Sequence, residues 1–70
     1  MNSYILRQID AEGSIVSEKH VEATGADAAL RQLSDIEIAT RRINVHDTDG
    51  QQVGQINADY WRQKYRRTRR

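Results

Sequence analysis

The chain has 70 residues, with 11 Lys and Arg, 10 Asp and Glu, no Cys and a formal net charge of +1. A chain of this length forms one domain with a small core, which leaves little room for an enclosed active site. The absence of Cys excludes disulfides and thiolate metal sites, and no apolar run approaches the roughly 20 residues of a membrane-spanning helix. We therefore expect a cytoplasmic protein without a membrane partner.

Two short turn motifs predict β-hairpins. Asp10–Gly13 and Asp47–Gly50 each consist of an acid, two tolerant residues and a Gly, which is the pattern of a type I turn closed by a glycine bulge. Both lie between β-favouring segments, so we expect two antiparallel hairpins. The four segments are 4–9, 15–21, 43–46 and 51–56.

A first helix is predicted after the first hairpin. Thr24 and Asp27 have the spacing of a capping box, in which Thr24 accepts an amide hydrogen bond at the start of the helix. A helix from about Ala26 to Leu33 would place Ala and Leu side chains on one face, as a helix lying on a sheet requires.

A second helix is predicted after the second hairpin, with Asn57 or Asp59 as its N-cap. Its Ala58, Trp61 and Tyr65 recur at helical intervals, so we expect this face to pack on the sheet. The residues that the periodicity turns toward solvent are Arg62, Gln63 and Arg66.

The order ββαββα predicts an α+β fold in which a four-stranded antiparallel sheet carries two helices on one face. The repeated turn suggests an internal duplication. Segment 34–42 changes its apolar phase before Ile43, which indicates a loop, a bend or a bulge. The other sheet face should be polar. Candidates to line that face are Gln8, Glu18, His20, Arg42, Asn44 and His46.

Candidate metal and catalytic residues do not form a recognisable site. His20 and His46, with Asp47, lack the close spacing of metal motifs. Asp47–Gly50 resembles part of a calcium loop, but Ile56 falls where the loop needs a Glu. No Ser, His and Asp set has the setting of a nucleophile, and the glycines do not form a phosphate loop. We expect no enzyme activity, no cofactor, no metal and no small-molecule substrate.

The sharpest feature is the charge asymmetry of the chain. Residues 1–61 contain five cations and ten acids, a net charge of −5, whereas residues 62–70 contain six cations and no acid. Clustered cations are suited to a polyanion or an acidic surface. The six candidates for contact with nucleic-acid phosphates are Arg62, Lys64, Arg66, Arg67, Arg69 and Arg70.

The sequence thus favours one α+β domain, residues 1–65, followed by a basic C-terminal tail, residues 66–70. Its favoured function is a non-enzymatic module that binds nucleic acid with little sequence preference. The alternative is a protein-interaction or homodimerisation module that uses a sheet face or an edge strand, with an incidental tail. No family is recognised from these residues.

Overall fold

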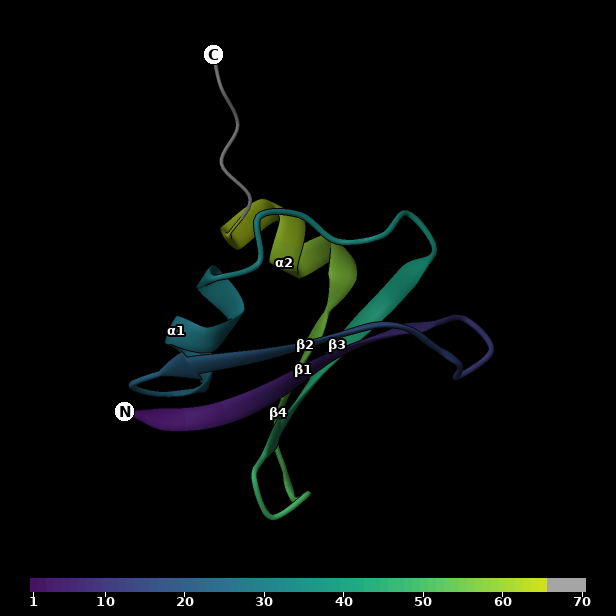
Figure 1. The fold of residues 1–70 in the computed structure, drawn as a ribbon. Coiled ribbons are helices and arrows are strands. Elements are labelled where there is room, and N and C mark those ends of the chain that lie inside the picture. Colours follow the sequence, from purple (N-terminus) through teal and green to yellow (C-terminus); the bar gives the residue numbers. More distant parts are fainter. Residues whose placement is uncertain (66–70) are drawn as a thin grey trace.

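The computed structural model describes residues 1–65, and the elements along this part of the chain follow the order ββαββα (Figure 1). This order confirms the predicted α+β fold. The elements are β1 (Asn2–Asp10), β2 (Ile15–Ala23), α1 (Ala26–Arg31), β3 (Thr40–Asp47), β4 (Gln52–Asn57) and α2 (Ala58–Lys64).

The four strands form one antiparallel sheet in the order β2-β1-β3-β4. β1 and β3 form its centre, where Leu6 lies opposite Val45. Both helices lie over the same face of the sheet (Figure 1). α1 packs on the first hairpin and α2 on the second. The opposite face has no helix over it among the described residues.

The two hairpin turns share one hydrogen-bonding pattern, as their common sequence motif predicts. The Asp10 carboxylate accepts the amides two and four positions further on, both at 2.9 Å, and Gly13 has a positive φ of 86°. The Asp47 carboxylate repeats these two bonds at 2.9 and 3.0 Å, and Gly50 has a φ of 83°. A carboxylate that holds its own turn and a Gly that permits positive φ therefore set both hairpins.

The start of α1 differs from the prediction. Gly25 is the N-cap, in extended backbone, and no side chain caps the helix. The predicted capping box of Thr24 and Asp27 is therefore wrong. The Asp27 carboxylate instead accepts a hydrogen bond from Tyr65, which follows α2. Asp27 is therefore bonded to Tyr65, a residue distant in the sequence, and not to the backbone at the start of its own helix as the sequence spacing predicted.

The end of α1 also comes earlier than predicted. The helix ends at Arg31, with Gln32 as its C-cap, whereas the sequence pattern extended it to Leu33. The side-chain amide of Gln32 donates to the Glu22 carbonyl at 2.6 Å, which ties the chain to β2 at this point. Leu33 remains in the core although it lies beyond the helix.

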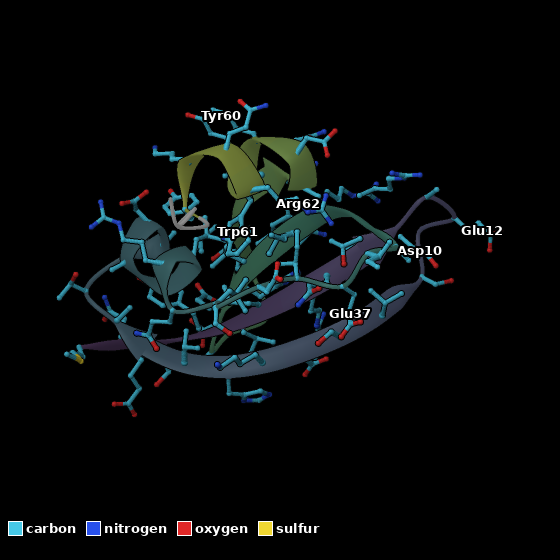
Figure 2. All side chains as sticks on the ribbon, turned by 90° about the horizontal axis from the view of Figure 1, so that it is seen from above. Asp10, Glu12, Glu37, Tyr60, Trp61 and Arg62 are labelled. Carbon is cyan, nitrogen blue, oxygen red and sulfur yellow. The ribbon has the colours of Figure 1, made fainter. Side chains whose placement is uncertain are left out.

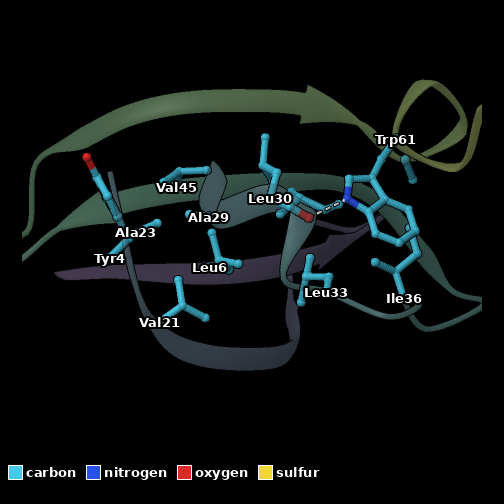
Figure 3. Close-up of a cluster of buried hydrophobic side chains, with 12 residues drawn as sticks. Tyr4, Leu6, Val21, Ala23, Ala29, Leu30, Leu33, Ile36, Val45 and Trp61 are labelled. Atoms are coloured by element: carbon cyan, nitrogen blue, oxygen red, sulfur yellow. Dashed lines mark hydrogen bonds between the residues drawn. The ribbon is translucent and has the colours of Figure 1, made fainter. Parts of the chain in front are cut away.

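The predicted N-cap and apolar face of α2 are confirmed for Asn57 and Trp61. The Asn57 side chain accepts the Asp59 amide at 2.8 Å and the Tyr60 amide at 3.3 Å. Trp61 is completely buried, and its indole N–H donates to the Leu30 carbonyl at 3.0 Å (Figure 3). A residue of α2 thereby satisfies a carbonyl of α1 and joins the two helices across the core.

Gln8 corrects the predicted composition of the polar face. It lies opposite Ile43 and so shares the helix-bearing face, where it is only 5% exposed. Its amide oxygen accepts the Glu37 amide at 2.7 Å and the Thr40 hydroxyl at 2.8 Å. Burial of this amide is tolerated because it holds the connection that leads into β3.

Segment 34–42 contains two of the predicted alternatives, a loop and a bulge. Ile36 is buried, whereas Ile38 is 92% exposed, and a turn joins the Thr40 amide to the Glu37 carbonyl at 3.0 Å. The register with β1 then shifts near Arg41, which is the bulge that changes the apolar phase.

Replacement of the buried indole should show how far the fold depends on it. We expect Trp61→Ala to lower the free energy of unfolding by about 3 to 5 kcal/mol, because it opens a cavity and removes the shorter of the two hydrogen bonds that the Leu30 carbonyl accepts. Gln63→Ala, at an exposed position of the same helix, should change it by less than about 0.5 kcal/mol. Urea unfolding followed by circular dichroism measures both variants. Equal effects would contradict the assigned role of Trp61.

Candidate nucleic-acid interface

Of the six cationic residues predicted to contact nucleic acid, the structure places two, Arg62 and Lys64, which lie in the last turn of α2. The other four lie outside the described residues. These are Arg66, Arg67, Arg69 and Arg70. The predicted basic tail, 66–70, therefore also lies outside them.

Arg62 is held by groups of its own chain. One guanidinium nitrogen lies 3.3 Å from the Asp59 carboxylate, and the other donates to the Glu37 carbonyl at 3.2 Å. Its side chain is 27% exposed, so it is less open to solvent than the helical periodicity predicts. Figure 2 shows Arg62 on the side of α2 that faces segment 34–39. Arg62 thus links α2 to this segment through a hydrogen bond.

The Lys64 side chain is more exposed to solvent than that of Arg62. Its ammonium lies 4.0 Å from the Asp27 carboxylate and 5.4 Å from the centre of the Tyr65 ring, and its side chain is 47% exposed. It also lies 5.7 Å from the Tyr60 ring centre. Exposed ion pairs and cation–π contacts of this kind contribute about 1 kcal/mol or less. Lys64 can therefore leave Asp27 for a denser set of anions.

Asp27 is the acid at which α1 and the end of α2 meet. It accepts the Tyr65 hydroxyl and lies 3.1 Å from the Arg31 guanidinium. The Tyr65 hydrogen bond, helped by Arg31 and Lys64, holds the pKa of Asp27 below its usual value. Burial, together with the bond to Asp27, raises the pKa of Tyr65 to about 12.

The aromatic residues of the C-terminal segment divide between core and surface. Trp61 is buried and Tyr65 is half-buried, with their ring centres 6.2 Å apart. Tyr60 is 52% exposed and projects away from the body of the molecule (Figure 2). Only Tyr60 among these three is free to present much of its ring to a partner.

The two histidines lie on the uncovered sheet face, on either side of Ile5 in β1. Neighbouring strands are about 4.8 Å apart, so their backbones are separated by roughly 10 Å. The Asp47 carboxylate is engaged by its own turn. Within residues 1–65, no three side chains of His, Cys, Asp or Glu are grouped so that they could hold a metal ion.

A shallow surface hollow of about 420 Å³ lies beside the first half of β1. Its lining residues include the polar residues Ser3, His20, Glu22 and Thr48. His20 faces Glu18 at 3.3 Å. A hollow of this volume can accept a small polar group, but neither Arg62 nor Lys64 is among its lining residues.

Comparisons with protein-family models, with curated proteins and with solved structures found no match. Among the helices of residues 1–65, none has the length and apolar character needed to cross a membrane.

The contact between Tyr65 and Asp27 makes stability depend on pH at the alkaline end. Because the pKa of Tyr65 is raised to about 12 in the folded chain, its contribution is complete below the ordinary value of 10 and is lost as the pH rises toward 12. We expect Tyr65→Phe to reduce the loss of unfolding free energy over this range, measured by urea unfolding at several pH values. Tyr60→Phe is the matched control and should behave like the unmodified chain. Identical pH profiles for all three would contradict the contact.

Proposed function

We propose that this protein is a cytoplasmic, non-enzymatic module that binds nucleic-acid phosphates through the end of α2 and the cationic residues that follow it. The observation that carries the proposal is the density of positive charge. Six of the last nine residues are cationic and none is acidic, whereas residues 1–61 have a net charge of −5. Phosphate contacts by clustered Lys and Arg give strong, salt-dependent binding with little sequence preference.

The position of Lys64 supports this proposal. Its side chain is 47% exposed, and its contact with Asp27 is at the 4.0 Å limit of an ion pair. Exchange of one exposed carboxylate for a row of phosphates releases counterions and so is favourable at low salt. Tyr60, half-exposed beside Lys64, offers a ring on which an unpaired base can stack.

Arg62 has a different part in the proposal. Its bonds to Asp59 and to the Glu37 carbonyl engage both guanidinium branches. A guanidinium that is already engaged adds to the positive potential near the helix but has fewer donors free for a phosphate. We therefore assign most of the binding to Lys64 and to the four arginines beyond Tyr65.

A second candidate function is protein interaction through the uncovered sheet face. Arg7 Nε and Asn44 Oδ1, on facing residues of β1 and β3, are buried and lack hydrogen-bond partners. Arg7 Nε does lie 3.3 Å from Glu18 but is not aligned for a hydrogen bond. These two atoms are enclosed by their own chain, but the Arg7 side chain as a whole is 34% exposed, so a partner on this face can reach its other guanidinium donors.

Titration of labelled single-stranded and duplex oligonucleotides tests the first proposal. We expect saturable binding, measured by fluorescence anisotropy, that weakens steeply with salt. A full-length variant with Gln at 66, 67, 69 and 70 should bind far more weakly. The slope of the logarithm of the binding constant against the logarithm of the salt concentration is the salt slope. If all four arginines contact phosphates, the salt slope of this variant for single strands should be smaller by about 3, since each contact contributes about 0.7.

The matched control removes cations elsewhere. Lys19→Gln combined with Arg41→Gln, at two exposed positions, should leave the dependence of binding on salt nearly unchanged. Equal losses in both variants would indicate a general charge effect and contradict the proposed site. Flat titrations of the unmodified chain at low salt would remove the nucleic-acid proposal and favour the protein-interaction candidate.

A further inference from the structure

The two edge strands of the sheet differ sharply in charge. β2 carries Glu18, Lys19, His20 and Glu22, whereas β4 has no charged side chain. Each pairs with one neighbour in the sheet of the described residues. Charged side chains at an edge prevent further strands from adding. β2 is protected in this way and β4 is not.

β4 has one protective device, a bulge near Val53, where the register with β3 shifts. Beyond the bulge, Gly54 to Asn57 pair regularly with β3. The outer backbone groups of this regular stretch are therefore arranged to accept another antiparallel strand.

Exposed apolar side chains accompany the β4 edge. Val53 is 46% exposed and Tyr60 is 52% exposed. Tyr60 belongs to α2, which packs on β3 and β4, and it points away from the rest of the molecule (Figure 2). The exposed Val53 thus adds apolar surface to the uncharged edge, which a second copy of the strand can cover.

We propose that two copies of this chain pair through their β4 strands, in antiparallel orientation, to form one eight-stranded sheet with four helices on one face. A copy of β4 meets β4 without any repulsion between like charges, because neither strand is charged. Pairing through β2 in a register centred on His20 would instead place Glu18 of each copy opposite Glu22 of the other. Pairing of β2 with β4 would leave an edge free at each end and would not close.

The two-fold symmetry restricts the register of this dimer. A two-fold axis perpendicular to the sheet keeps all helices on one side, so residues that face each other must project from the same face. A register centred on Gln55 meets this condition and keeps the pairing within the regular part of β4. It places Gly54 opposite Ile56 of the second copy on the helix-bearing face, and the two Gln55 amides opposite each other on the uncovered face.

The absence of Cys from the chain allows a direct test of the register. In Gln55→Cys the two introduced thiols would lie on directly opposed residues, whose Cα separation in an antiparallel pair suits a disulfide. We expect mild oxidation of the full-length variant to give a covalent dimer on non-reducing gels. Glu22→Cys, on the other edge strand, should give at least tenfold less.

Sedimentation of the unmodified chain should give the mass of two copies. The Gln55→Lys variant should sediment with the mass of one copy, and its circular dichroism spectrum should match that of the unmodified chain. The matched variant Glu22→Lys should remain a dimer. A monomeric unmodified chain at all concentrations, or equal cross-linking of the two Cys variants, would overturn the proposal. Because these measurements use no nucleic acid, they are independent of the function proposed above.

Discussion

The hydrogen bond from the Trp61 indole to the Leu30 carbonyl is the interaction on which the rest of the fold depends. α1 has only six residues, too few to be stable as an isolated helix. Trp61 covers its last turn, satisfies one of its carbonyls and is itself fully buried. α1 is therefore stabilised by α2, and the two halves of the chain share one core.

A second link between the helices has consequences for electrostatics. Asp27 of α1 engages Tyr65 and lies within ion-pair distance of both Arg31 and Lys64. Together with the pair between Arg62 and Asp59, this places an acid beside each cation of α2. The positive charge of the helix is thus partly neutralised by the body, whereas no acid follows Lys64 in the sequence.

Local features of the structure could be predicted from the sequence, and features that depend on distant partners could not. The hairpin turns were predictable because Asp10 and Asp47 bond to amides within four positions. Trp61 was predictable from helical periodicity. Gln8 was misplaced because the partner that justifies its burial, Glu37, is 29 positions away. The role of Asp27 was missed for the same reason, since Tyr65 is 38 positions away.

The matching turns at Asp10 and Asp47 also bear on how the chain folds. Each turn sets the register of its own hairpin through bonds within a few residues, so both hairpins can form with little loss of chain entropy. The pairing of β1 with β3 is different, because it brings together residues as far apart as Leu6 and Val45 and has no turn to guide it. We therefore expect closure of this long loop to be the slow, non-local step in folding. On this argument the central strand pair, rather than either hairpin, should govern how fast the native topology is reached.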